Sequence, residues 1–263
     1  MSKTSVALLW ALALAPAAAL AQSAFDGTWK IDLGKLQLPA KPDVLLLQEG
    51  RYECRTCAPA IGVTADGADH AVGGYPYFDT MAVKVVDEHT VQVTQKKAGK
   101  VVATSTTMVS PDGRRADFEF SDRSNSDSAP VTGKGSMARE GKAPAGAHAL
   151  SGTWRTTGYQ AVSDNALVFS LHMDGDSLSM SSPTGQAYTA RLDGIRAPYR
   201  GDPGITAVAL KKLGRQAVEE TDFRDGRVVG VTRMTVAPDG RSMTLSIDDK
   251  LRGKTMSAVA IKQ

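Results

Sequence analysis

The only two cysteines of the chain stand three positions apart. Cys54 and Cys57 form a Cys-Arg-Thr-Cys segment that is followed directly by Ala58 and Pro59. A pair at this spacing has three chemistries open to it: a local disulfide, a redox-active dithiol, or half of a zinc site. Each of these makes a different demand on the surrounding sequence.

The surrounding sequence favours the disulfide. A thioredoxin-type dithiol needs a βαβ setting, and covalent haem attachment needs a histidine where Ala58 stands. A structural zinc ion needs four ligands, and no second Cys-x-x-Cys or His-x-x-x-His occurs. A fully extended i to i+3 span is about 10 Å between Cα atoms, too long for a disulfide, so the chain must bend here. We predict a Cys54–Cys57 disulfide, with no metal and no cofactor.

Three aromatic residues gather in residues 73–79, which read Gly-Gly-Tyr-Pro-Tyr-Phe-Asp. Aromatic side chains beside glycine and proline, between strands, are typical of a barrel mouth or a ligand-contacting loop. The alternative is a packed loop that closes one end of a barrel. Residues 197–203 are the matching stretch of the second half and keep one tyrosine. The predicted ligand-binding residues are Tyr52, Tyr75, Tyr77, Phe78 and Tyr199.

Catalytic motifs do not occur in the sequence. It has no Gly-x-Ser-x-Gly, His-Glu-x-x-His or phosphate-loop motif. Its four histidines are dispersed along the chain: His70, His89, His148 and His172. We therefore predict no catalytic residue. Catalytic groups that meet only in the folded protein leave a hydrolase or an isomerase open.

The composition is that of an ordinary globular protein, with 42% hydrophobic and 22% charged residues. The net charge is +3, and the basic residues are interspersed with acidic ones. Nucleic-acid binding requires a concentrated positive face, so no nucleic-acid partner is predicted. The sequence does not indicate an oligomeric state.

The chain contains an internal duplication, with two copies of one repeat unit. Residues 25–30 (FDGTWK) recur as residues 150–155 (LSGTWR), and residues 109–114 (VSPDGR) recur as residues 236–241 (VAPDGR). Matches in the same order over so long a period describe two whole domains rather than a solenoid. Residues 142–149 are small and broken by proline, which is typical of a linker. We predict one domain over residues 22–141 and a second over residues 150–263.

Within each unit, short extended runs alternate with turns. Residues 90–95 (TVQVTQ) and 116–120 (ADFEF) alternate with period two, and Pro-Asp-Gly forms a tight turn between extended runs. No apolar stripe with a helical period persists for three turns. The pattern predicts an all-β protein of two tandem antiparallel domains, each a calycin-like barrel or a sandwich.

The N-terminus has the pattern of a cleaved signal peptide. Lys3 precedes an apolar run over residues 6–14, and Ala19-Leu20-Ala21 has the small-x-small pattern of a cleavage site. We predict a signal peptide over residues 1–21, cleavage before Gln22, and a periplasmic or secreted protein. No later segment approaches the roughly 18 apolar residues of a spanning helix, so no membrane span is predicted.

The Gly-Thr-Trp segments at Trp29 and Trp154 resemble the Gly-x-Trp opening of lipocalins and related calycin barrels. The resemblance covers about six residues of each unit, and the later lipocalin motifs are absent. The alternative is a core tryptophan of another β-sandwich. Over its length the chain also resembles a group of uncharacterised exported bacterial proteins with tandem Gly-Thr-Trp units. That resemblance implies an exported protein with two repeats and no particular activity.

Three hypotheses follow for the function. The first is a binding protein that holds a small, partly apolar molecule in a β-unit. The second is a structural or interaction module of the cell envelope. The third is a hydrolase or isomerase with dispersed catalytic residues, and we favour an enzyme less than a binding protein because no catalytic motif is present.

Overall fold

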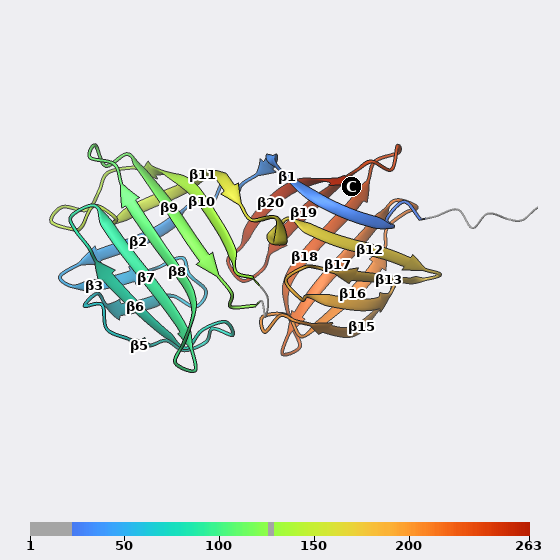
Figure 1. Cartoon of the computed structure of the whole chain (residues 1–263), viewed down its shortest axis with the longest axis horizontal. Coiled ribbons are helices and arrows are strands. Elements are labelled where there is room, and N and C mark those ends of the chain that lie inside the picture. Colours follow the sequence, from blue (N-terminus) through green and yellow to red (C-terminus); the bar gives the residue numbers. More distant parts are fainter. Residues whose placement is uncertain (1–22, 126–128) are drawn as a thin grey trace, which may run out of the picture.

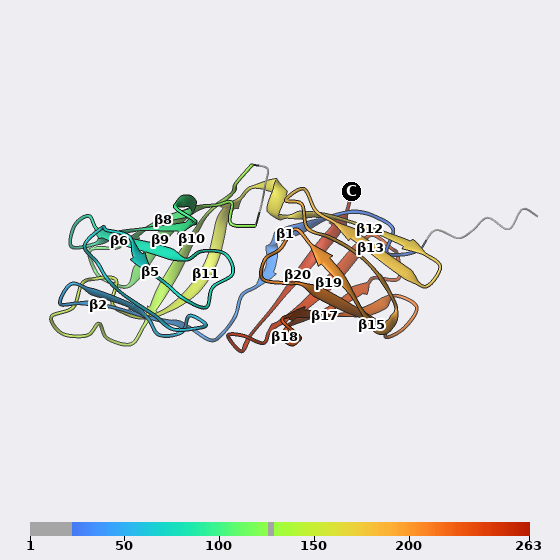
Figure 2. The same ribbon diagram turned by 90° about the horizontal axis from the view of Figure 1, so that it is seen from below.

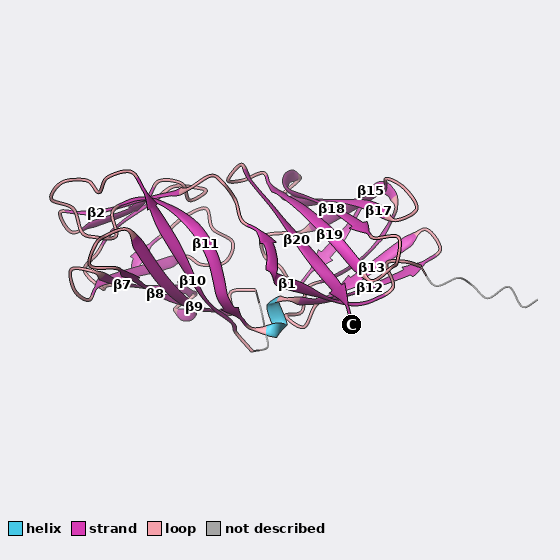
Figure 3. Ribbon diagram, turned by 90° about the horizontal axis from the view of Figure 1, so that it is seen from above, coloured by secondary structure: helices cyan, strands magenta, loops and turns pink. Residues whose placement is uncertain are grey.

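The computed structural model describes residues 23–125 and 129–263, which form two antiparallel β-units that lie side by side along the long axis of the molecule (Figure 1). The only helical segment in these ranges is the single 3-10 turn η1, Asp164–Ala166, and Figure 3 shows the other described residues as strands, loops and turns. The predicted all-β class with two antiparallel units is confirmed. The predicted signal peptide over residues 1–21 lies outside the described residues.

The first unit is a ten-stranded sheet with the order β4-β3-β2-β11-β10-β9-β8-β7-β6-β5. Its strands are β2 (Asp43–Gln48), β3 (Arg51–Cys54), β4 (Ile61–Thr64), β5 (His70–Ala71), β6 (Thr80–Val85), β7 (Thr90–Lys97), β8 (Lys100–Val109), β9 (Arg115–Asp122), β10 (Val131–Glu140) and β11 (Gly152–Val162). Each neighbouring pair is antiparallel, as expected for strands joined by short turns.

The second unit is a closed barrel with the order β1-β12-β13-β14-β15-β16-β17-β18-β19-β20. Its strands are β1 (Gly27–Gln37), β12 (Val168–Asp174), β13 (Ser177–Ser181), β14 (Ala187–Arg191), β15 (Asp193–Arg200), β16 (Ala207–Lys212), β17 (Ala217–Arg224), β18 (Arg227–Val236), β19 (Ser242–Asp249) and β20 (Lys254–Lys262).

The first strand of each repeat is exchanged between the units. β1 belongs to the second barrel, where it pairs with β12 (Thr28 opposite Ser170) and with β20 (Lys30 opposite Ile261). β11 belongs to the first unit, where it pairs with β2 and β10. Figure 1 shows β1 in blue among the red and orange strands of the second unit. The exchange closes the second barrel with the first strand of the chain.

The observed units therefore differ from the predicted boundaries. The first unit is the continuous stretch of residues 43–162, and the second unit combines residues 168–263 with β1. Residues 142–149, predicted to link the domains, join β10 to β11 within the first unit. The connections between the units are residues 38–42 and residues 163–167, and Figure 2 shows the chain crossing between them. Each unit therefore takes its Gly-Thr-Trp strand from the other half of the sequence.

The two tryptophans anchor the exchanged strands in the opposite cores. Trp29 and Trp154 are fully buried, Trp29 in the core of the second unit and Trp154 in that of the first. Each indole Nε1–H donates to the backbone carbonyl four residues earlier, at 2.8 Å for Trp29 and 2.7 Å for Trp154. The glycines two residues before them have φ values of 129° and 147°, which a side chain disfavours.

The two units differ in how they close. In the second unit, β14 pairs with β15, which completes the ring of strands. In the first unit, β4 and β5 are the two ends of the sheet and do not pair. The disulfide and the aromatic segment follow β3 and β5, so both lie at this opening. Among the described residues, no helix is long and apolar enough to cross a membrane.

Candidate functional site

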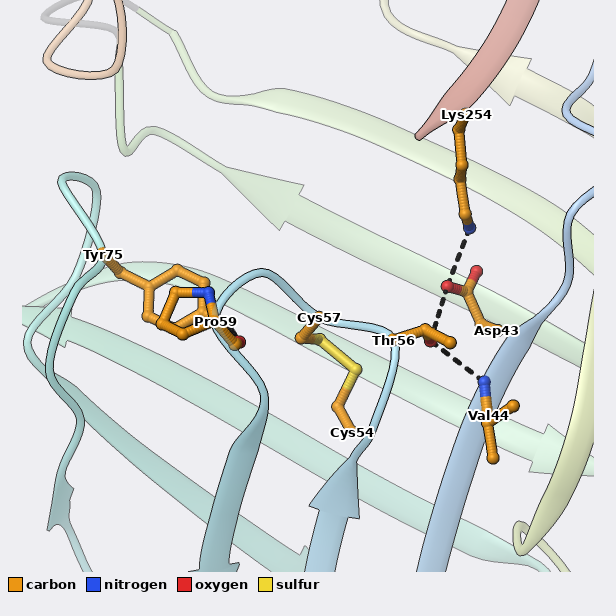
Figure 4. Close-up of a disulfide and its surroundings, with 8 residues drawn as sticks. All are labelled: Asp43, Val44, Cys54, Thr56, Cys57, Pro59, Tyr75 and Lys254. Atoms are coloured by element: carbon orange, nitrogen blue, oxygen red, sulfur yellow. Dashed lines mark hydrogen bonds and ion pairs between the residues drawn. A yellow bond between two sulfur atoms is a disulfide. The ribbon is translucent and has the colours of Figure 1, made fainter. Parts of the chain in front are cut away.

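The predicted disulfide is present and shapes the opening of the first unit (Figure 4). Cys54 and Cys57 are bonded, with their Cα atoms 5.4 Å apart, so the chain bends after β3 as predicted. Within the bend, the Thr56 hydroxyl donates to Asp43 at 3.1 Å and accepts the N–H of Val44 at 3.0 Å. These bonds hold the bend against the start of β2.

The second unit also contacts Asp43, beside the disulfide bend. Lys254, at the start of β20, donates to the Asp43 carboxylate at 2.8 Å, as Figure 4 shows. The Lys254 side chain is 13% exposed and that of Asp43 is 35% exposed, so the ion pair is partly shielded from solvent. A shielded pair is screened less by salt than a surface pair, so this contact helps to hold the two units in register.

The aromatic segment packs against the bend that follows the disulfide. Tyr75 donates its hydroxyl hydrogen to the carbonyl of Pro59, and its ring stacks on Phe78 with centroids 4.6 Å apart. Gly74 has a φ of 83°, and a Cβ there would stand 2.9 Å from the Pro59 ring. Glycine is therefore required at position 74, both for the turn and for the close approach.

Tyr77 extends from the first unit to the second. Its hydroxyl donates to Asp202 at 2.9 Å, and Asp202 also accepts the N–H of Gly204 at 2.7 Å. The Tyr77 ring lies directly over Gly204, where any side chain would overlap it. Burial, followed by the charge of Asp202, raises the pKa of Tyr77 above its usual value. Tyr77 is thus a neutral donor at physiological pH.

A cavity of about 630 Å³ lies between the units, next to these aromatic residues. The aromatic wall comes from the first unit and consists of Tyr52, Tyr75, Tyr77 and Phe78. The facing wall comes from the second unit and consists mainly of Gly204, Ile205, Asp222, Arg224, Val229, Gly230, Thr232 and Ile247. Four of the five predicted ligand-binding residues therefore line one cavity.

The fifth predicted residue, Tyr199, lies elsewhere. It is inside the second barrel, where its ring is 5.6 Å from that of Tyr188, and it does not line the cavity. Tyr52 is the most buried of the aromatic wall, and burial raises its pKa to about 12. The wall is therefore uncharged at neutral pH.

The facing wall contains one member of a pair of carboxyl groups, Asp222, and its partner Glu220 lies next to it inside the second barrel. Glu220 and Asp222 alternate on β17 and point into the second barrel with Val218. The Tyr188 hydroxyl donates to Glu220 at 2.5 Å. Burial, and then the neighbouring Glu220 carboxylate, raise the pKa of Asp222 to about 8, and burial also raises the pKa of Glu220. Both carboxyl groups are therefore harder to ionise than exposed ones, and ionising one opposes ionising the other.

A sequence signal for this pair exists. In the strand Ala-Val-Glu-Glu-Thr-Asp-Phe-Arg, positions 218, 220 and 222 share one face, and Val218 marks that face as the inner one. The matching positions of β7 carry Val91, Val93 and Gln95. Glu220 thus stands at the place of a valine and Asp222 at that of a neutral glutamine, and acidic residues on an inward face are unusual and point to a site.

The histidines do not join this site. His70 contacts Asp66 at 2.8 Å and His172 lies 3.5 Å from Asp26, but none of these four residues lines the cavity. A second hollow, of about 470 Å³, lies over β8, β9 and β10 and is lined largely by serine and threonine. In residues 23–125 and 129–263, no three His, Cys, Asp or Glu side chains are grouped as a metal site.

The comparisons with known proteins do not assign the chain to a family. It matches no protein-family model, and no curated protein is significantly similar to it. Function must therefore be argued from the cavity itself.

Proposed function

We propose that the protein is a periplasmic or secreted binding protein, which holds a small, partly apolar molecule in the cavity between its two β-units. The observation that carries the proposal is the convergence of Tyr52, Tyr75, Tyr77 and Phe78 on one cavity of about 630 Å³. Ligand pockets are commonly about 300–1,000 Å³ and combine apolar walls with a few polar groups. This cavity has the size and the composition of such a pocket.

Structural supports around the cavity favour binding over simple packing. The disulfide bend and the stack of Tyr75 on Phe78 fix the aromatic wall, and the bond from Tyr77 to Asp202 fixes its distance from the second unit. A wall that is held before the ligand arrives loses little conformational entropy on binding. Export is supported by the disulfide, because disulfides persist in oxidising compartments, and by the predicted signal peptide.

The test is native mass spectrometry of the protein purified from its own cell envelope, before and after mild denaturation. We expect an added mass of a few hundred daltons that is released on unfolding, since roughly that size fills such a pocket. Thr232→Trp places a large ring in the cavity and should remove the added mass. Thr235→Trp is the matched control, because Thr235 lies on the same strand and is exposed. A bare protein mass in the unaltered chain would contradict the proposal.

A second candidate, an enzyme using general acid–base chemistry, has one observation in its favour. The pKa of Asp222 is raised to about 8, which suits a proton-transferring group at neutral pH, and Asp222 lines the cavity. Among the described residues of the aromatic wall, however, no second acid or base faces Asp222 across the cavity. Turnover of the molecule recovered from the envelope, lost in Asp222→Asn, would favour this candidate.

A further inference from the structure

Asp222 and Asp26 are the two buried carboxylate residues among the described parts of the chain, and each is 8% exposed. Asp26 accepts the backbone N–H groups of Ser23 at 2.9 Å and Met173 at 2.6 Å. Oδ1 of Asp222 is buried and has no hydrogen-bond partner among the described residues. Buried carboxylates are normally compensated by donors or cations, so Asp222 lacks a partner that its environment calls for.

The position of Asp222 leaves room for that partner in the cavity. Gly230 on β18 stands opposite Asp222 in the ladder, and both residues line the cavity. A Cβ at position 230 would stand 3.2 Å from Oδ2 of Asp222. Glycine therefore keeps the space beside the carboxyl group open on the side from which a ligand would approach.

The chain's own cations do not fill this place. Arg252 lines the cavity but lies 3.9 Å from Asp249, and Arg224 makes no ion pair with any described residue. Acidic residues outnumber basic ones in the lining, since Asp122, Asp222, Asp248 and Asp249 face only Arg224 and Arg252. The excess of carboxylates favours a cationic guest over an anionic one.

From this arrangement we infer that the ligand carries a protonated amine that pairs with Asp222, on an apolar body that lies against Tyr77 and Phe78. The inference rests on the proposed function and names the chemical class of its ligand. An ammonium group supplies hydrogen-bond donors and a positive charge, which the Glu220–Asp222 pair lacks. The aromatic wall suits the body of such a molecule, and aromatic faces also attract a nearby cation.

The test compares three probes of nearly equal shape on the unaltered protein: 2-phenylethylamine, 2-phenylethanol and 3-phenylpropanoate. Their affinities are measured by isothermal titration calorimetry at neutral pH. We expect the amine to bind at least tenfold more tightly than the alcohol, with the carboxylate the weakest. An alcohol or a carboxylate that binds as well as the amine overturns the inference. This comparison does not depend on the folding of any variant.

Two variants locate the contact. Asp222→Asn keeps the shape and removes the carboxyl group that would ionise beside an ammonium, and it should lower amine affinity at least tenfold while changing alcohol affinity less than threefold. Asp248→Asn is the control, because Asp248 also lines the cavity but is paired with Lys250 near solvent. It should change amine affinity less than threefold. Equal losses in both variants would show general attraction and contradict a contact at Asp222.

Failure of this inference can be told apart from failure of the proposed function. A neutral or anionic molecule in the native mass spectrum, lost in Thr232→Trp, would retain the binding protein and reject the amine. An empty cavity in protein from the envelope would reject both. If none of the three probes binds at millimolar concentration, the inference is rejected, while the envelope measurement still decides the proposed function.

Discussion

The two units place very different residues at matching positions of the same framework. β7 and β17 occupy matching registers, because Met81 pairs with Gln95 as Val208 pairs with Asp222. Where the first unit has Val93 and Gln95, the second has Glu220 and Asp222. At these two positions the first unit has uncharged side chains and the second has two carboxyl groups. A repeated β-framework therefore fixes the positions of side chains and leaves their chemistry free to diverge.

A second contrast concerns closure. The pair of Tyr188 and Tyr199 on β14 and β15 seals the second barrel, whereas Ile61 on β4 has no partner strand on that side. The opening of the first unit is occupied instead by the disulfide bend and the aromatic segment. The aromatic wall thus lies where the first unit does not close, and the carboxyl pair of Glu220 and Asp222 lies in the unit that does close.

The largest expected effect tests the exchange of the first strands. Trp29→Ala should destabilise the second unit by about 3–5 kcal/mol, because it leaves a large void in that core. Trp154→Ala should do the same to the first unit. Hydrogen exchange with mass spectrometry should show lost protection over residues 168–263 for Trp29→Ala and over residues 43–162 for Trp154→Ala. The opposite assignment would show that the strands are not exchanged.

The next effect sharpens the contrast between the two interiors. The pKa of Asp222 is about 8 in the fold and about 4 when unfolded, so the folded state binds the extra proton between these values. Stability should therefore fall as pH rises from about 4 to about 8, by up to about 1.4 kcal/mol per pH unit. Urea unfolding across this range measures it.

The control for this pH dependence gives the second unit the residues of the first. Glu220→Val with Asp222→Gln should flatten the slope, because neither new side chain titrates. The single variant Asp248→Asn is the control, and it should keep the wild-type slope because Asp248 is near solvent. A slope that survives Glu220→Val with Asp222→Gln would assign the titration to other groups.

The disulfide should have a smaller effect on stability. Replacing both Cys54 and Cys57 by serine should cost about 2 kcal/mol at most, because the closed loop is very short. We expect a larger loss of order in the aromatic wall, because Tyr75 packs on the bend after the disulfide. Hydrogen exchange over residues 72–79 should rise in the serine variant. Unchanged hydrogen exchange in that segment would show that the disulfide does not stabilise the aromatic wall.

The smallest effect concerns the contact between the units. Tyr77→Phe removes the hydrogen bond to Asp202 and should cost about 1 kcal/mol. Tyr159→Phe is the matched control. The Tyr159 ring contacts Phe118 edge-on, and no described residue accepts a hydrogen bond from the Tyr159 hydroxyl. Urea unfolding compares the two variants. Equal costs would mean that the bond to Asp202 does not contribute.

Much of this fold could be predicted because its signals are local. Period-two alternation and Pro-Asp-Gly turns specify strands wherever they occur, and the disulfide joins residues only three apart. The aromatic segment is also local, which is why Tyr75, Tyr77 and Phe78 were found together. Tyr52 was added because the preceding hairpin could bring it near them, and in the structure it lies on β3 and lines the same cavity.

The remaining features depend on which distant segments meet. The segments around Trp29 and Trp154 are nearly identical, so their sequence does not distinguish one partner sheet from the other. The pairing partner is then set by tertiary context, which local patterns do not contain. Asp222 was missed for a related reason: a carboxylate on a strand is normally assigned to the solvent face, and only the register with Val218 shows that it points inward.

The place of β1 also governs when the molecule can finish folding. The strand that leaves the ribosome first must wait for β20, which ends at Lys262, before its ladder is complete. Pairings between the two ends of a chain are slow to form, and an unpaired strand can join a neighbouring copy instead. While it folds, the protein thus carries an unpaired strand edge until β20 has formed, so its folding yield should fall as the concentration of incompletely folded copies rises.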